Sequence, residues 1–344
     1  MQSEPGRPLW RRLLLPVVTV IGLILVAPVL IDVYSSVGDI TNLGVGWQLA
    51  MIAATVAQLT AFWELHRIVM RTDRWFDVAV PHLVGNAASH LAPGGGPVGA
   101  GIQTRMMTTA GFSVARVVTA LGAITIVSSV ANFVVLPLFV LAASVVGSDV
   151  DAHLVAAMWF GALLLAVALV LAVVVILRDG PWRRLSHVLS WAYGRMRRET
   201  NALDLERRLI GERDLIRRAL RERAAVASIA VVASALGDFA VLYFALRAVG
   251  AHVSLGAALA AFIVSNVAGL IPITPGGLGF VEAGMAGVLT LAGATSAQAD
   301  LAVVAYRLVA TWLPCAAGAV SLFWFQRRHR NRRLREMLAP LSPV

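Results

Sequence analysis

The sequence predicts an all-α fold: a polytopic membrane bundle of about six full spans plus two re-entrant broken-helix hairpins in an inverted repeat. Hydrophobic residues make up 58% of the chain, charged residues only 14%, and the mean hydropathy is +0.78. Several apolar runs approach the roughly 20 residues that cross a bilayer. Proline and glycine interrupt two of them, at 90–105 and 272–284. We expect one transmembrane domain over 1–344, with related halves at about 1–147 and 152–326.

Composition excludes several classes of protein. The net charge is +10, but all 29 basic residues are arginine and most flank apolar spans, which is the positive-inside pattern of membrane proteins and not a nucleic-acid surface. The absence of lysine excludes a Walker A phosphate loop and a lysine Schiff base. A single cysteine, Cys315, and histidines without HExxH spacing predict no metal and no cofactor.

The first part of the chain is predicted to begin and end in the cytoplasm. The apolar run at 13–31 is long for a signal peptide and lacks a cleavage site of small residues, so we expect a retained helix. The loop at 32–44 carries two acids and no arginine, so it should lie outside. A second helix over 45–66 ends in HRIVMRTDRW, whose arginines mark the return to the cytoplasm.

The first broken element follows. Residues 76–92 and 98–112 form two short apolar pieces separated by APGGGPVG. At about 1.5 Å per residue each piece reaches only about 22–26 Å, against a hydrocarbon core of roughly 30 Å. A re-entrant hairpin that enters from the cytoplasmic side therefore fits better than two crossings.

The middle of the chain is predicted to cross twice and then form a cytoplasmic segment. An apolar helix over 117–143 contains Pro137, which predicts a kink, and 154–177 returns. Residues 178–223 hold 13 arginines and 7 acids, and apolar residues recur among them at helical spacing. This pattern predicts an amphipathic helix on the headgroups or against the bundle, which either orients the protein or docks a membrane-enzyme partner. Its predicted N-cap and apolar positions are Asn201, Leu205, Leu209, Ile216 and Leu220.

The second half repeats the arrangement. A span over 224–246 is followed by a broken element at 255–271 and 277–293, and 301–325 returns to the cytoplasm before the basic tail 327–344. We therefore expect both termini in the cytoplasm of a cell that carries the protein in its inner membrane.

The number of crossings sets the orientation of the two broken elements. Three full crossings separate them, so they enter from opposite faces. Oppositely oriented units with a Gly/Pro-interrupted helix are typical of transporters whose site lies near the midplane. Broken backbone is tolerated at that depth only where protein or a wet cavity satisfies it. The half-helix after each break points amide donors inward, which favours a phosphate or a carboxylate.

Three ionisable residues lie in the second-half spans: Asp238 at mid-helix, Glu282 after the break and Arg307 in the last span. Each costs roughly 2.5–3.5 kcal/mol at the bilayer centre, so each should face a partner or a cavity. Arg307 paired with Glu282 or Asp238 is either a structural salt bridge or part of a headgroup or proton-coupling site. Arg105 is the first-half counterpart or a cytoplasmic-side anchor.

The candidate site follows from these arguments. The predicted substrate-binding residues are Pro93, Gly94, Gly95, Arg105, Asn266, Pro275, Gly276, Gly277, Gly279, Glu282 and Arg307. The ion-coupling candidates are Asp238 and Glu282.

The motif TPGGLGFVEAG, followed about 20 residues later by AYRLVATWLPCAAG, resembles the lysylphosphatidylglycerol synthase transmembrane-region family of flippase-like membrane proteins. LAPGGGPVGAGIQTRMM resembles the family's other motif, and the similarity covers nearly the whole chain. The resemblance implies movement of a lipid between leaflets, in the best-known member an aminoacylated phosphatidylglycerol, and it points to the same proline, glycine, glutamate and arginine positions.

The chain departs from that family in two respects. We expect no aminoacyl-transferase domain beside the transmembrane region, so the resemblance does not imply synthesis of a lysyl-lipid. Gly99, Ala100 and Gly101 stand where many members place an acid.

We therefore expect a non-enzymatic protein that flips an anionic or aminoacylated phospholipid or a lipid-linked precursor, with membrane lipids as its partners. The alternative is a non-transporting scaffold or regulator of a lipid- or cell-envelope-modifying enzyme, which would dock through 178–223. A third hypothesis, an enzyme acting on lipid-linked sugar, rests only on the DxD pattern of Asp149 and Asp151, in a loop expected outside.

The predicted topology has a direct test. In a chain that carries Cys315→Ala, the variants Ser148→Cys and Ser254→Cys should react with a membrane-impermeant maleimide added to intact cells. Ser186→Cys should react only after the membrane is opened, because positive flanks stay inside. Reaction of Ser186→Cys in intact cells would contradict the inverted arrangement.

Overall fold

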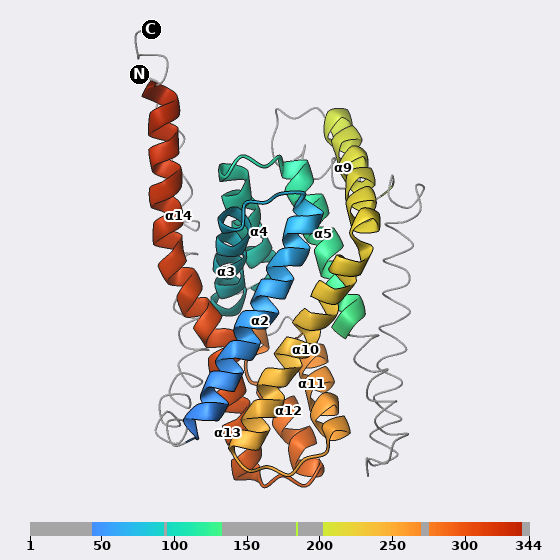
Figure 1. The fold of residues 1–344 in the computed structure, drawn as a ribbon, viewed down its shortest axis with the longest axis vertical. Helices are drawn as coiled ribbons and strands as arrows, with labels where there is room; N and C mark the ends of the chain where they lie inside the picture. Colours follow the sequence, from blue (N-terminus) through green and yellow to red (C-terminus); the bar gives the residue numbers. More distant parts are fainter. Residues whose placement is uncertain (1–42, 93–94, 133–183, 185–201, 270–274, 339–344) are drawn as a thin grey trace, which may run out of the picture.

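The computed structural model describes residues 43–92, 95–132, 184, 202–269 and 275–338, and all of its regular elements are helices (Figure 1). They are α2 (Val45–Met70), α3 (Phe76–Leu91), α4 (Gly95–Thr109), α5 (Val114–Val130), α9 (Ala202–Glu222), α10 (Ala224–Ala248), α11 (Leu255–Gly269), η2 (Pro275–Gly277), α12 (Phe280–Leu291), α13 (Ser296–Arg307), η3 (Leu308–Trp312) and α14 (Leu313–Leu338). The predicted spans 13–31 and 154–177, and Pro137, lie outside the described residues.

Among the described residues, three helical stretches are long and apolar enough to cross a membrane: α2, α10 and the continuous run Ser296–His329. They contain 26, 25 and 34 residues. At about 1.5 Å per residue, each is longer than the roughly 30 Å hydrocarbon core. The predicted class, an all-helical membrane bundle, is therefore confirmed, and three of the predicted crossings correspond to helices of sufficient length and hydropathy.

The last crossing starts earlier than the predicted residue 301. Thr295 and Gln298 form a capping box: the Thr295 hydroxyl accepts from the Gln298 amide at 3.2 Å, and Gln298 Oε1 accepts from the Thr295 amide at 3.1 Å. α13 then continues into α14 through the π-helical turn η3. Pro314 follows this turn and has no amide hydrogen to donate to the preceding turn, which explains the local change of winding.

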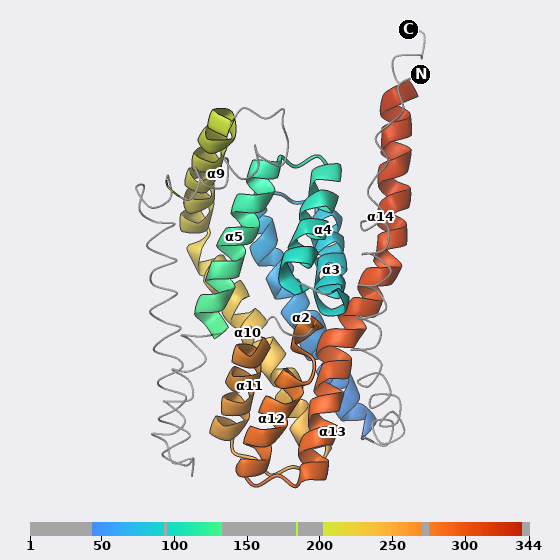
Figure 2. The same cartoon turned by 180° about the vertical axis from the view of Figure 1, so that it is seen from behind.

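Two helical hairpins occupy opposite halves of the bundle (Figures 1 and 2). α3 lies beside α4, and α11 lies beside α12. The four helices have 16, 15, 15 and 12 residues. None exceeds about 24 Å, so each is too short to cross a bilayer alone. The turn η2 between α11 and α12 contacts both α3 and α4, so the two hairpins meet at their broken ends.

Small residues allow these helices to pack closely. A Cβ added at Gly318 on α14 would lie 2.6 Å from the carbonyl oxygen of Leu83 on α3. A Cβ at Gly237 on α10 would lie 2.9 Å from the Cβ of Gln58 on α2. The backbones of both pairs of helices are therefore in contact. Such close packing is usual between membrane helices, because the hydrophobic effect does not drive them together in lipid.

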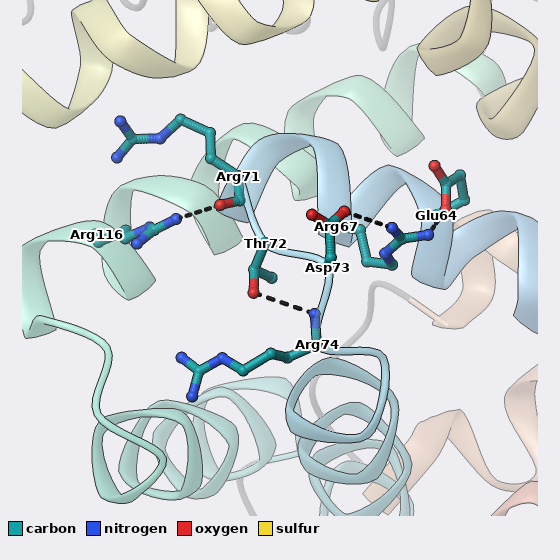
Figure 3. Close-up of polar contacts among 7 residues, drawn as sticks. All are labelled: Glu64, Arg67, Arg71, Thr72, Asp73, Arg74 and Arg116. Atoms are coloured by element: carbon teal, nitrogen blue, oxygen red, sulfur yellow. Dashed lines mark hydrogen bonds and ion pairs between the residues drawn. The ribbon is translucent and has the colours of Figure 1, made fainter.

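The turn between α2 and α3 carries a cluster that we call the arginine-rich end, which Figure 3 shows. It consists of Arg67, Arg71, Arg74 and Arg116. Arg71 ends α2 in the left-handed conformation, with a φ of 50°. Arg116 of α5 donates to the backbone carbonyls of Met70 and Arg71, the latter at 2.8 Å. Carbonyls at a helix C-terminus have no partner within the helix, so Arg116 caps α2 from a neighbouring helix.

The predicted amphipathic segment is the helix α9, and it packs against the bundle. Its apolar residues Leu209 and Ile216 are buried, and α9 contacts both α5 and α2. An ion pair of 2.5 Å between Arg71 and Glu212 ties it to the arginine-rich end. The sequence predicted a helix either on the headgroups or against the bundle, and in the structure α9 packs against the bundle.

The hairpin of α3 and α4 can be tested with two neighbouring glycines. A Cβ at Gly99 would overlap the Ser89 hydroxyl and the Gly85 carbonyl, whereas one at Gly101 meets nothing within 4 Å. We expect Gly99→Ala to destabilise the protein by about 1–3 kcal/mol because the helices must separate. Gly101→Ala should be neutral or stabilising by up to about 1 kcal/mol because alanine favours helix. Thermal unfolding in detergent measures both, and equal midpoints would contradict the close packing.

Candidate functional site

The second break is a sharp turn made by three glycines. Gly276, Gly277 and Gly279 have φ values of 61°, 70° and 86°. Side chains other than glycine rarely adopt this left-handed region. Pro275 begins the single turn η2, and Gly279 is the residue before α12. α11 ends at Gly269, and the PGGLG turn directly precedes the start of α12 at Phe280.

Glu282 joins the start of α12 to the end of α13. Its Oε2 accepts a hydrogen bond from the Gly279 backbone amide at 2.8 Å, and its Oε1 accepts from Arg307 Nε at 2.6 Å. One carboxylate therefore satisfies an amide at a helix N-terminus and offsets the charge of an arginine. Of the two partners predicted for Arg307, the structure shows Glu282.

Arg307 is buried, and two of its donors are bonded within the described residues. Its side chain is 7% exposed, and its Nη2 also lies 3.4 Å from the carbonyl oxygen of Gly276. A guanidinium has five N–H donors. The contacts with Glu282 and Gly276 are its hydrogen bonds within the described residues, and they use two of these donors. The remaining donors can bind a carboxylate or phosphate without breaking the ion pair.

Two further second-half candidates are bonded within the bundle. Tyr306 donates its hydroxyl to Asp238 Oδ1 at 3.1 Å, which connects α13 to the middle of α10. Asn266 donates its side-chain amide to the carbonyl of Phe262 one turn earlier at 3.0 Å, so it serves its own helix. Asp238 on α10 is therefore bonded to Tyr306, the residue that precedes Arg307 on α13.

The first hairpin reaches this break through His90. A Cβ at Gly276 would lie 3.1 Å from His90 Cα and would overlap His90 Nδ1. His90 therefore occupies the space where any other residue at position 276 would place its side chain. Sequence reasoning did not identify His90 because nothing in the local pattern shows which residue of one hairpin meets the turn of the other.

The other first-half candidates are Pro93, Gly94, Gly95 and Arg105. Pro93 and Gly94 lie outside the described residues. Gly95 begins α4 with a φ of 49°. Arg105 is exposed near the far end of α4, about 15 Å along the helix from Gly95. Its role as a headgroup ligand stays a prediction.

A second buried polar cluster lies between α2, α3 and α4. Trp63 Nε1 donates to His82 Nδ1 at 3.0 Å, and Gln103 Nε2 lies 3.5 Å from His66 Nε2. The His66 and His82 rings are 5.4 Å apart. These side chains satisfy one another, which favours a packing role. In the described ranges, no group of three His, Cys, Asp or Glu side chains could hold a metal ion.

Comparison with known proteins finds similarity to one described family. The family "Lysylphosphatidylglycerol synthase TM region" matches residues 13–318. Two curated relatives, both named "UPF0104 membrane protein" and both from Methanothermobacter thermautotrophicus, are 30% identical over 79 residues and 32% identical over 84 residues. These alignments cover 23% and 24% of this chain and 24% and 25% of the relatives, so the chain spans about a quarter of their length.

The ion pair across the break should show energetic coupling. We expect Glu282→Ala to cost about 3–5 kcal/mol because it leaves the buried Arg307 charge unpaired. Arg307→Ala alone should also destabilise, and the double variant should lose about 1–3 kcal/mol less than the sum of the two. Unfolding in detergent gives all three values. Arg247→Ala, which removes an exposed arginine, is the control. Additive losses at positions 282 and 307 would contradict the coupling.

Proposed function

Because the chain belongs to the lysylphosphatidylglycerol synthase TM-region family, we propose that it flips a phospholipid or lipid-linked precursor with an anionic or aminoacylated headgroup between the leaflets of a bilayer. The chain is a membrane protein of that family, and the movement of lipid is the proposed step. The headgroup binds at the second break, and the acyl chains stay in the surrounding lipid.

The observation that carries this proposal is the state of Arg307. Insertion of an arginine into the membrane costs free energy, so an arginine in such a position usually has a functional or a pairing role. Here Glu282 orients the guanidinium at 2.6 Å, and three of its five donors have no hydrogen bond to any residue that the structure describes. A pure salt bridge would need no break in the helix, whereas a headgroup site gains from both the free donors and the exposed backbone at the glycines.

The arrangement of the hairpins supports the same function. Two short helical pairs in opposite halves meet at their broken ends, and we interpret them as re-entrant hairpins of an inverted repeat. Transporters of that architecture bind substrate where the repeats meet and expose the site to one face at a time. In this proposal the arginine-rich end faces the cytoplasm, both termini lie there, and the protein resides in the cell membrane.

Asp238 and Glu282 supply the negative charge of the site. Glu282 holds Arg307, and Asp238 is bonded to Tyr306. Two carboxylates against one guanidinium leave one negative charge in excess when all are ionised. We assign Asp238 to offset an amino group on the headgroup or to carry a proton during transport.

The test is leaflet exchange of a fluorescent phosphatidylglycerol in liposomes that contain the purified protein, scored by access of dithionite to the label. Wild-type protein should exceed protein-free liposomes. Glu282→Gln should reduce the exchange rate about tenfold, because a charge-assisted hydrogen bond that orients Arg307 is weakened. Arg307→Lys should reduce it similarly, because lysine lacks the forked donors.

Asp300→Asn is the matched control, since it removes an exposed carboxylate from the same helix as Arg307. It should exchange lipid at the wild-type rate. Each variant is used only if it elutes as folded protein on gel filtration. Equal rates for wild type and Glu282→Gln would contradict a site at the second break, and a wild-type rate equal to that of protein-free liposomes, also with phosphatidylethanolamine and lysyl-phosphatidylglycerol, would contradict flipping.

A further inference from the structure

We propose that His90 of the first hairpin binds the phosphate of the lipid headgroup together with Arg307 of the second half. This inference rests on the proposed function and extends it, because it makes the site a joint property of the two hairpins. His90 is absent from the set that sequence reasoning identified.

The first step is geometric. Gly276 contacts both His90 and Arg307. Because it has no Cβ, the His90 imidazole fits against it, and its carbonyl oxygen accepts from Arg307 Nη2 at 3.4 Å. A single residue therefore separates the two side chains. One bound phosphate, whose oxygens are about 2.5 Å apart, can accept from an imidazole N–H through one oxygen and from a guanidinium N–H through another.

The second step compares His90 with the other described histidines of α2 and α3. His66 bonds the Phe62 carbonyl at 3.0 Å, and His82 accepts from Trp63 at 3.0 Å. In the part of the chain that the structure describes, the His90 ring makes no such bond, and it is only partly buried. A partly buried imidazole in a membrane-embedded turn, beside a buried arginine, has hydrogen-bonding capacity that a ligand can use.

The third step concerns where a transported headgroup must bind. In an inverted repeat the substrate lies between the repeats, so groups from both halves contact it. Arg307, Glu282 and the glycine turn all belong to the second half, and Arg105 of the first half lies far along α4. His90 is the side chain that the first hairpin places against the second break. With His90, groups from both halves reach the site, as that architecture requires.

The first experiment measures binding without transport. The protein is placed in liposomes of phosphatidylcholine alone or with an equal amount of phosphatidylglycerol, and modification of each histidine by diethyl pyrocarbonate is followed by mass spectrometry. Phosphatidylglycerol should slow the modification of His90 at least about fivefold, since a bound ligand excludes the reagent. Exposed His252, in the loop before α11, is the internal control and should react equally in both.

The second experiment measures exchange as a function of the phosphatidylglycerol fraction. His90→Leu should raise the half-saturating fraction about tenfold, because a hydrogen bond to a charged group is lost. His90→Gln keeps an N–H donor and should stay closer to wild type. A merely structural role would lower the amount of folded protein or the maximal rate and leave half-saturation unchanged. His252→Leu controls for the loss of a histidine.

The outcomes separate the two proposals. Protection of His90 without any lipid exchange would overturn the proposed transport and support the headgroup contact. Exchange with unchanged half-saturation in His90→Leu, together with equal modification of His90 in both lipids, would overturn the role of His90 and leave the transport proposal standing.

Discussion

The bonds of the Glu282 carboxylate are the interaction on which the site depends. The first amide groups of a helix have no partner within the helix, and a buried guanidinium has a charge that must be offset. Glu282 meets both needs, because one oxygen binds the Gly279 amide and the other binds Arg307. The start of α12, the end of α13 and the position of the glycine turn are thereby fixed relative to one another.

The second constraint on the packing is that three positions must be glycine, because a side chain there would overlap a neighbouring helix. The absence of a Cβ admits His90 at Gly276, brings α14 onto α3 at Gly318 and closes the first hairpin at Gly99. Each of these contacts involves backbone or a short side chain, so a neighbour could not move aside at low cost. At Gly276 the two hairpins are therefore in direct contact, and close packing of this kind leaves little room for rearrangement.

Hydropathy and arginine position were sufficient to predict the membrane bundle, because burial in lipid requires long apolar helices whatever their tertiary contacts. The PGG break and the acid after it were also predictable from local chemistry. The capping box at Thr295 was a readable signal that the last helix begins before residue 301. His90 was not predictable, because its role depends on which turn of the other hairpin it meets. Arg105 shows the converse: its polarity suggested a site, but its helix carries it away from the break.

The two contacts of Arg307 differ in a way that suits a site for a transient ligand. The Nε contact with Glu282 is short, at 2.6 Å, and it fixes the orientation of the guanidinium plane. The Nη2 contact with the Gly276 carbonyl is long, at 3.4 Å, and therefore weak. A phosphate oxygen at about 2.8 Å would form a stronger bond with Nη2 than the carbonyl does. In the proposed function, the headgroup would replace the weaker contact while the stronger one keeps the arginine in position, so that the guanidinium is oriented before binding.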